Sequence, residues 1–161
     1  IVVDSDCAAS GACQAGSVQL HWLADELAAH QRVCTLVIAH HPRFSSGHHG
    51  PSLPHQPLWE TLVAGGADVL INGHDHHYER FGPLDAAGAP NQSGPRTFIA
   101  GTGGRAAYPL REPPAAGSEF RMTGEAGVLV LTLAPGGYHF SFLTIDGEVA
   151  DQGDGLCQSG R

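Results

Sequence analysis

The chain has 161 residues, a formal net charge of -8 at pH 7 and no lysine among its 8 basic residues. This length suits one domain with a buried core. The negative charge disfavours a nucleic-acid partner or an anionic membrane surface, because both require clustered positive charge, and no apolar run is long enough to span a membrane. An anionic substrate would therefore have to be held by groups other than basic side chains, and bound cations can do this.

The cysteines give a first indication of compartment. Cys7 and Cys13 flank a short flexible loop that a disulfide could close, with two free thiols as the alternative. A bridge would indicate a secreted or extracytoplasmic protein, since disulfides persist mainly outside the cytoplasm. Cys34 begins an apolar run and is expected to be a small buried hydrophobic residue.

The first part of the chain predicts a helix followed by a buried strand. Residues 17–30 place Leu20, Leu23 and Leu27 at helical spacing, with a serine as natural N-cap. Residues 34–40 then form a continuous apolar run of β-favouring residues. Such a run is typical of a strand covered on both faces in a parallel sheet.

A second helix and strand complete a βαβ unit. Pro57 stands near the start of the predicted helix, Gly65 and Gly66 stand at its end, and residues 67–72 predict the second strand. The two strands of such a unit run parallel, so their carboxyl ends meet at one edge of the sheet, where open α/β sheets bind ligands. If the strands are neighbours, these ends lie only about 4.8 Å apart.

The rest of the chain is expected to be mainly strands and loops. Residues 96–104 predict a strand and a glycine-rich loop, which is more typical of a tight turn than of an anion site. Residues 105–124 are rich in Pro, Gly and Ala without periodicity, and we expect a long surface loop. Residues 127–153 predict a β-meander, with Pro-Gly-Gly and Asp-Gly at its turns.

Histidines gather at the expected ligand edge of the sheet. His40 ends the first strand of the βαβ unit, and His74 and His76 follow the second, alternating across Asp75. In an extended segment the rings of His74 and His76 would point to the same side, and two adjacent ions could each take one. Imidazole ligands favour a transition metal, because calcium and magnesium prefer oxygen. An exposed polar loop is the alternative to a metal site.

Other histidines have weaker claims. His41 precedes a proline and is expected to be structural or to support the ligands. His48 and His49 lie in a flexible loop over the same edge, where one could contact substrate, and two solvated residues are the alternative. His77 is as compatible with exposure as with function. The remaining histidines stand alone and are expected to be solvated or locally hydrogen-bonded: His21, His30, His55 and His139.

Four sequence motifs, taken in chain order, resemble those of a known protein family. VIAHHPRF, GHHG, INGHDHHYERF and FIAGTGG together resemble the C-terminal half of the calcineurin-like metallophosphoesterases, in particular secreted bacterial relatives of the purple acid phosphatases. The similarity covers most of residues 1–104, and the tail GEVADQGDGLC is also similar. The resemblance implies an α/β fold, namely the C-terminal half of an α/β/β/α sandwich in which the βαβ unit is followed by the meander.

The resemblance also implies site residues and chemistry. It implies two divalent or trivalent transition-metal ions, drawn from iron, zinc and manganese, that hydrolyse a phosphate ester substrate. His40 and His74 match ligands of one ion, and His76 matches a ligand of the other. His49 best matches a histidine that contacts the phosphate and can protonate the leaving group. The preference for His49 over His48 rests on the resemblance alone.

The chain departs from the family in its upstream ligands. Two GD motifs and a GNH motif, which include the carboxylate that bridges the ions, precede the first histidine in the family but do not precede His40 here. The chain also begins inside the strand-like pattern IVVD. We therefore expect residues 1–161 to be the C-terminal portion of a single domain whose N-terminal half is missing, and to be inactive in isolation. Two other functions compete: a histidine-rich metal-binding module without chemistry, and a catalytically inactive relative that recognises a partner.

Overall fold

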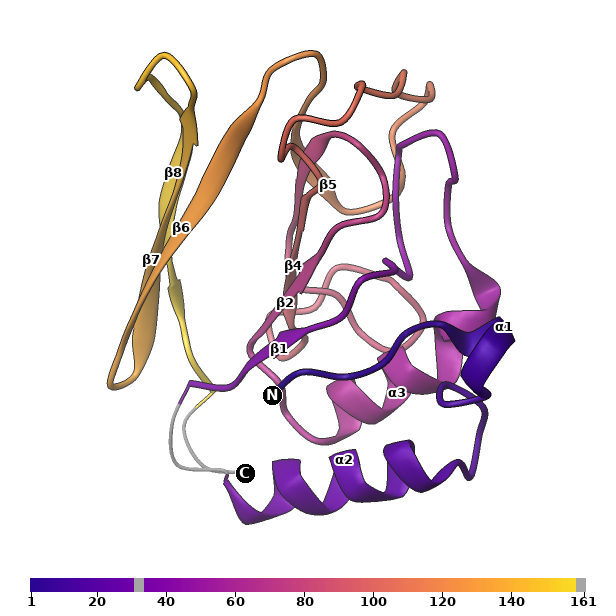
Figure 1. The fold of residues 1–161 in the computed structure, drawn as a ribbon. Helices are drawn as coiled ribbons and strands as arrows, with labels where there is room; N and C mark the ends of the chain where they lie inside the picture. The colour runs from indigo at the N-terminus through magenta and orange to yellow at the C-terminus, as the bar shows by residue number, and fades with distance from the viewer. Residues whose placement is uncertain (31–33, 159–161) are drawn as a thin grey trace.

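A computed structural model describes residues 1–30 and 34–158. Figure 1 shows three layers, with helices packed on one face of a first sheet and a second sheet packed on its other face. The helices are α1 (Cys7–Ser10), α2 (Val18–Ala29), the 3-10 helix η1 (Leu53–His55) and α3 (Gln56–Ala64). The strands are β1 (Leu36–Ile38), β2 (Val69–Asn72), β3 (Tyr78–Phe81), β4 (Arg96–Ala100), β5 (Ser118–Met122), β6 (Gly127–Ala134), β7 (Gly137–Thr144) and β8 (Val149–Leu156).

The predicted βαβ unit is confirmed. The first sheet has the strand order β1-β2-β4-β3-β5, and β1 lies beside β2 in parallel, with Ile38 opposite Ile71. Strand β4 also runs parallel to β2, whereas β3 is antiparallel to both of its neighbours, β4 and β5. The second sheet, β6-β7-β8, is the predicted antiparallel meander. This mixed α/β arrangement confirms the expected fold class.

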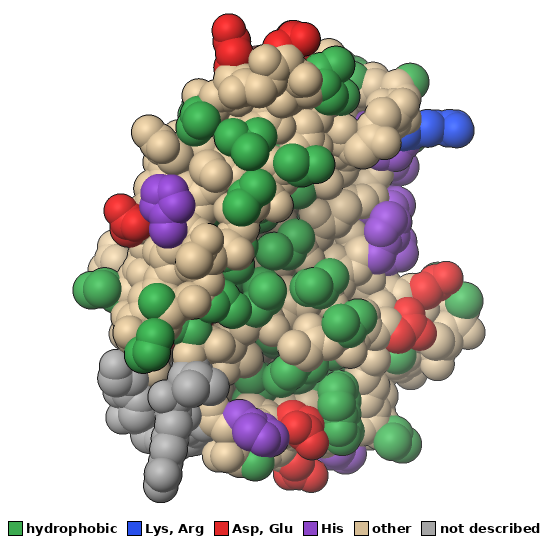
Figure 2. Space-filling view, turned by 60° about the vertical axis from the view of Figure 1, so that its left-hand side comes forward, with side chains coloured by type: hydrophobic (Ala, Val, Ile, Leu, Met, Phe, Trp, Pro, Cys, Tyr) green, Lys and Arg blue, Asp and Glu red, His purple; other side chains and the backbone are tan. Residues whose placement is uncertain are grey.

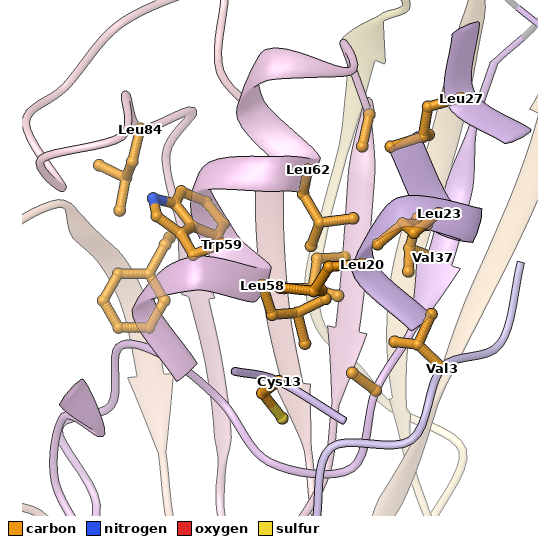
Figure 3. Close-up of a cluster of buried hydrophobic side chains, with 14 of the residues drawn as sticks. Val3, Cys13, Leu20, Leu23, Leu27, Val37, Leu58, Trp59, Leu62 and Leu84 are labelled. Atoms are coloured by element: carbon orange, nitrogen blue, oxygen red, sulfur yellow. The ribbon is translucent and has the colours of Figure 1, made fainter. Parts of the chain in front are cut away.

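Two apolar clusters hold the layers together. On the helix side, Leu20, Leu23 and Leu27 are buried as the helical spacing predicts (Figure 3). Between the sheets, the ring of Tyr78 stacks on that of Phe142 with centroids 4.1 Å apart. Because both faces of the first sheet are covered, the residues of β1 and the first three residues of β2 are continuously apolar.

Both disulfides lie in places that the sequence only partly indicated. Cys7 and Cys13 are bonded, which confirms the suggested bridge. The expectation for Cys34 was wrong, because its sulfur is bonded to Cys157, 123 positions away. This bridge ties the segment before β1 to the end of β8. Sequence spacing cannot show such a contact, because the two cysteines meet only after both sheets have packed.

The region between β4 and β6 also differs from expectation. Residues 105–124 were predicted to be a surface loop throughout, but β5 lies within them and pairs with β3 at the edge of the first sheet. Strand β3 itself was not predicted. Its two polar residues, Glu79 and Arg80, stand between the buried rings of Tyr78 and Phe81, so the strand has neither an apolar run nor a strict alternation.

The surface agrees with the composition. Figure 2 shows hydrophobic side chains scattered over the side of the molecule that the meander forms, with few basic groups among them. Val128, Val130 and Leu133 of β6 are among the exposed apolar residues. Within residues 1–30 and 34–158, no helix is both long and apolar enough to cross a membrane.

Candidate metal centre

Three histidines meet at the carboxyl ends of β1 and β2. His40 and His41 follow β1 and His74 follows β2, and each offers a ring nitrogen such that these atoms all lie within 4.8 Å of one another. The ring centroids of His41 and His74 are 4.3 Å apart, and those of His40 and His74 are 5.3 Å apart. The parallel pairing of neighbouring strands therefore brings His40 and His74 together, and it adds His41, which sequence reasoning had treated as a supporting residue.

Short polar contacts fix the backbone of this cluster. The side-chain amide of Asn72 donates to the carbonyl oxygens of Ala39 (2.7 Å) and His41 (3.1 Å). The hydroxyl of Ser5 accepts from the backbone N–H of His41 and lies 3.1 Å from its Nδ1. Asn72 Oδ1 is buried and has no hydrogen-bond partner among the described residues. An oxygen acceptor is thus left over beside the imidazoles.

The backbone at His74 is not extended, contrary to the expectation for residues 74–76. His74 has φ 64°, in the left-handed region that a non-glycine residue seldom adopts, and the N–H of Asp75 donates to the carbonyl of Gly73 across it. The segment is therefore bent, not extended as the alternation argument assumed. Left-handed conformations of such residues cost about 1–3 kcal/mol and cluster at functional sites, where surrounding contacts hold them in place.

The electrostatics keep the central rings neutral. Burial, together with the charges that His41, His49 and His40 would carry, lowers the pKa of His74 to about 4. Burial likewise lowers the pKa of His41, with contributions from His40 and His55. A neutral imidazole has a free lone pair, so these rings can take a cation near neutral pH without first losing a proton.

His76 is not part of this group of three and belongs to a different local environment. Its Nδ1 lies 2.9 Å from the carbonyl oxygen of Ala106, and its ring stacks on that of Tyr108 with centroids 4.0 Å apart. A carbonyl only accepts, so Nδ1 carries the proton and Nε2 keeps the lone pair. Such a contact is how an outer partner fixes the tautomer of a metal-binding histidine. Tyr108 comes from the loop that sequence analysis found uninformative.

The loop of His48 and His49 approaches the cluster from the other side. Both side chains are exposed. The ring of His49 has its centroid 4.3 Å from that of His74, and the ring of His48 lies 5.2 Å beyond that of His49. The geometry therefore places His49 next to the candidate ligand His74.

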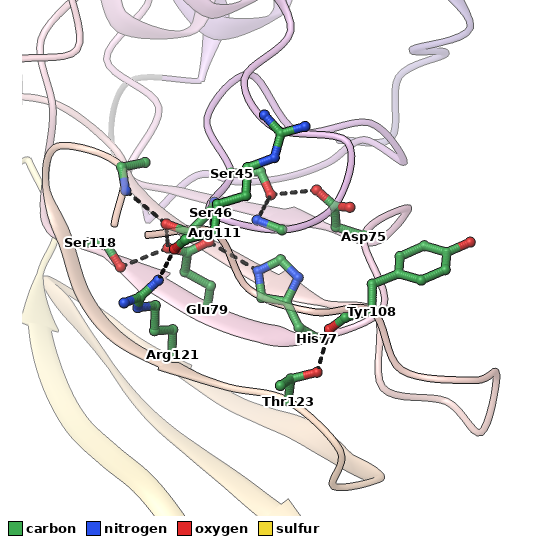
Figure 4. Close-up of polar contacts among 12 residues, drawn as sticks. Ser45, Ser46, Asp75, His77, Glu79, Tyr108, Arg111, Ser118, Arg121 and Thr123 are labelled. Carbon is green, nitrogen blue, oxygen red and sulfur yellow. Dashed lines mark hydrogen bonds and ion pairs between the residues drawn. The ribbon is translucent and has the colours of Figure 1, made fainter. Parts of the chain in front are cut away.

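A buried carboxylate holds this loop in place (Figure 4). Asp75, which is fully buried, accepts the backbone N–H of His49 at 3.0 Å and a short hydrogen bond from the hydroxyl of Ser45. The Ser45 hydroxyl in turn accepts the N–H of Gly47. The aspartate between the two motif histidines is thus occupied as an anchor for His49, which its position in the sequence did not reveal.

A second buried carboxylate supports the same loop. Glu79 accepts hydrogen bonds from the backbone and hydroxyl of Ser46 (2.8 and 2.6 Å) and from the hydroxyl of Ser118 (2.6 Å). His77 Nε2 lies 3.0 Å from it, and the ring of His77 is fully buried, so His77 is not exposed and its contact is with Glu79 (Figure 4). Burial raises the pKa of Glu79, but these hydrogen bonds outweigh burial and lower it overall.

The other candidates have structural explanations. Cys7, Cys13 and His55 lie close enough to suggest a metal site, but both sulfurs are in the disulfide. His55 is buried, with Ser52 Oγ 2.7 Å from Nδ1 and the Ser5 carbonyl 2.8 Å from Nε2. His21, His30 and His139 are exposed. The glycine-rich loop after β4 is a turn tied to β6, since the hydroxyl of Thr102 donates to the carbonyl of Gly127.

The donor set suits a transition metal. Imidazole nitrogens bind zinc, iron and related ions well, whereas magnesium and calcium require a shell of oxygens. Three converging imidazole rings, of which His41 and His74 have a lowered pKa, fit such an ion. The histidine group therefore has the chemistry expected of a metal centre.

Comparisons with known proteins agree with this arrangement. No protein-family model matches the chain. A stretch of 74 residues, 44% of the chain, is 38% identical to an acid phosphatase of Aspergillus ficuum, of which it spans 12%. The solved structure of the purple acid phosphatase PPD1 from yellow lupin matches 96% of the chain with a TM-score of 0.80 at 18% identity. The chain has the fold of a purple acid phosphatase. A TM-score of 0.77 over 100% of the chain, also at 18% identity, relates it to GAP50, the anchor in the inner membrane complex of Plasmodium.

These comparisons confirm the resemblance at the level of the fold. The chain spans only 30% of the lupin phosphatase and 50% of the Plasmodium protein. At 18% identity a shared fold does not by itself carry an activity, because one fold serves many functions. The lupin protein is a phosphatase by name and the Plasmodium protein an anchor, so the site residues must decide between such roles.

Proposed function

We propose that this chain supplies the histidine ligands of a two-metal site that hydrolyses phosphate esters. The observation that carries the proposal is the convergence of His40, His41 and His74 at the ends of two parallel strands, in a chain with the purple acid phosphatase fold. His40 and His74 would hold one ion, with His41 as a further imidazole. His76, whose Nε2 keeps its lone pair, would hold the other.

Iron, zinc or manganese fits these donors. When bound, two such ions neutralise charge on the phosphoryl group and activate a water for in-line attack. This explains how a chain of net charge -8 without lysine would bind an anion.

His49 would act on the substrate directly. Its exposed ring lies beside that of His74, and its backbone is held by Asp75. From there a ring N–H can donate to a phosphoryl oxygen or pass its proton to the leaving oxygen as general acid. Asp75 cannot take that role, because both of its oxygens already accept hydrogen bonds. His49 is therefore the candidate acid.

The number of metal ligands in the histidine group supports a domain that extends beyond this chain. No carboxylate among the described residues belongs to the group formed by His40, His41 and His74, whereas paired ions in hydrolases are usually bridged by oxygen ligands. We infer that residues 1–161 are the C-terminal portion of a single domain and that an upstream segment supplies the remaining ligands. The isolated chain would then hold metal through its histidines but hydrolyse nothing.

The two disulfides fit an oxidising compartment, and we propose a secreted or extracytoplasmic location. A phosphate ester would be the partner of the site. The acidic composition favours neither nucleic acid nor an anionic membrane as a second partner.

The test is turnover of a chromogenic phosphate monoester by the protein extended upstream in its reading frame, loaded with zinc, iron or manganese. We expect His49→Gln to lower kcat at least 100-fold, in the range of general acid catalysis, with metal content unchanged. His48→Gln, one position away and also exposed, is the matched control and should change kcat little. Stoichiometric metal without turnover in any form of the protein would favour the binding-module function instead.

A further inference from the structure

Tyr108 lies in the segment between β4 and β5 and contacts three histidines of the candidate site. Its ring stacks on that of His76, with centroids 4.0 Å apart and an interplanar angle of 12°. The rings of His48 and His49 lie next to it, with centroids 5.2 and 5.5 Å away. Tyr108 belongs to neither of the two apolar clusters that hold the layers together. Its ring therefore packs on imidazoles and not on the hydrophobic core.

Hydrogen bonds on both sides hold the backbone of Tyr108 in place. Its N–H donates to the carbonyl of His76 at 3.1 Å, and its carbonyl accepts the hydroxyl of Thr123 at 2.6 Å (Figure 4). Two positions earlier, the carbonyl of Ala106 lies 2.9 Å from Nδ1 of His76. Residues 106–108 thus hold His76 at its main chain, at one ring nitrogen and on one face of its ring.

The same segment is also tied to the loop that carries the candidate acid. The N–H of Arg111 donates to the carbonyl of Ser46 at 2.7 Å, and its guanidinium donates to the carbonyl of His48 at 2.6 Å. One short stretch, residues 106–111, therefore contacts both this loop and the ring of His76.

These contacts bear on the tasks proposed for His76 and His49. A metal ligand must present its nitrogen in one direction, and loss of an outer partner that orients a ligating histidine typically costs 10–100-fold in metal affinity or activity. A general acid must likewise stay within hydrogen-bond reach of the leaving oxygen. Because Tyr108 lies against both rings, its position limits how far each of them can turn.

We propose that Tyr108 is a positioning residue, which orients His76 toward its ion and fixes the separation of His76 from His49. The inference rests on the proposed function, because the two histidines have these tasks only if the site hydrolyses a phosphate ester. The contacts with the histidines are made by the flat ring. Phenylalanine should therefore replace Tyr108 without loss, whereas leucine, which has no flat face, should not.

The experiment compares Tyr108→Phe and Tyr108→Leu in the protein extended upstream. Arg105→Leu is the matched control, since Arg105 is exposed and lies in the same segment. Zinc titration should show that one of the two ions binds 10–100-fold more weakly to Tyr108→Leu than to wild type. At saturating zinc, the kcat of this variant for a chromogenic phosphate monoester should fall by a similar factor with little change in KM. Tyr108→Phe and Arg105→Leu should match wild type in all three quantities.

NMR of labelled histidine rings in the metal-free 161-residue protein tests the same contacts without turnover. His76 should carry its proton on Nδ1 in wild type and in Tyr108→Phe. In Tyr108→Leu the ring is free to turn away from the Ala106 carbonyl, so both tautomers should be populated.

The outcomes separate this inference from the proposed function. Wild-type zinc affinity, kcat and tautomer in Tyr108→Leu would overturn the positioning role and leave the phosphate-ester function standing. Equal losses in Tyr108→Phe and Tyr108→Leu would also overturn it, because the hydroxyl and not the ring would then be required. Absence of turnover in the zinc-loaded wild type would overturn the proposed function, and the positioning role with it.

Discussion

An added methyl group at Gly47 has no room in this structure. A Cβ there would lie 2.5 Å from Cε1 of His77 and 2.6 Å from Cγ of Asp75, and atoms do not approach so closely without a shift. Asp75 and His77 cannot shift easily, because hydrogen bonds hold their backbone. The N–H of Asp75 donates to the carbonyl of Gly73, and the carbonyl of His77 accepts from the N–H of Gly101, the residue after β4. We therefore expect Gly47→Ala to displace the loop that carries His49.

The cost follows from two contributions. Overpacking a filled interior usually costs about 1–3 kcal/mol. The displaced loop also weakens the hydrogen bond from the His49 N–H to the buried Asp75 carboxylate, and bonds to charged groups contribute about 1.5–3 kcal/mol. Because the loop can relax partly, we expect a loss of about 2–4 kcal/mol in the free energy of unfolding. For a chain of this size, that corresponds to a fall in Tm of roughly 4–16 °C.

Urea unfolding measures this loss, provided that the m-value is unchanged. Gly103→Ala is the matched control, because Gly103 has ordinary backbone geometry and a Cβ there would meet nothing within 4 Å. Zinc binding should survive in Gly47→Ala, since His40, His41 and His74 lie on other segments. Equal stability of the two variants would refute the packing described for Asp75 and His77.

Four further substitutions test the fold. Glu79→Gln should lower the free energy of unfolding by about 2–4 kcal/mol at pH 7. The fold lowers the pKa of Glu79 below its usual 4.5, so the stabilisation by its carboxylate is complete above pH 4.5 and is lost as the pH falls. The free energies of unfolding of wild type and variant, measured in urea, should therefore become equal at low pH. Cys34→Ser should lower the free energy of unfolding by up to about 5 kcal/mol and Cys7→Ser by about 2 kcal/mol, because the lost bridges close loops of 123 and 6 positions. The urea midpoint of Cys34→Ser should therefore be the lower of the two. Asp151→Ala should lower the free energy of unfolding by about 3 kcal/mol, because it leaves the buried hydroxyl of Tyr78 unpaired between the sheets. Thermal unfolding should show this loss as a lower Tm.

Much of the scaffold could be predicted from local sequence. The βαβ unit was recognisable because its strands are covered on both faces and its helix is bounded by Pro57 and a pair of glycines. The topological rule for parallel strands then placed His40 and His74 at one edge, as the structure shows. Strand β5 was missed because edge strands are only half covered and lack a clear apolar pattern.

The finer parts of the site depend on contacts that are distant in sequence. Tyr108 reaches His76 only because the loop after β4 folds back, and its composition gives no sign of this. The anchoring role of Asp75 depends on Ser45 and His49, which lie some thirty positions away. The bend at His74 was unpredictable because a histidine rarely takes a left-handed conformation, and tertiary contacts must hold it there.

The most direct test of the central claim is the amount of zinc that remains on the 161-residue protein after dialysis, compared between wild type, His74→Ala and His139→Ala. His139 is an exposed histidine on the meander, so its loss controls for nonspecific imidazole binding. We expect wild type and His139→Ala to retain the same zinc and His74→Ala to lose most of it. Equal zinc in all three proteins would contradict the assignment of the histidine cluster as a metal centre.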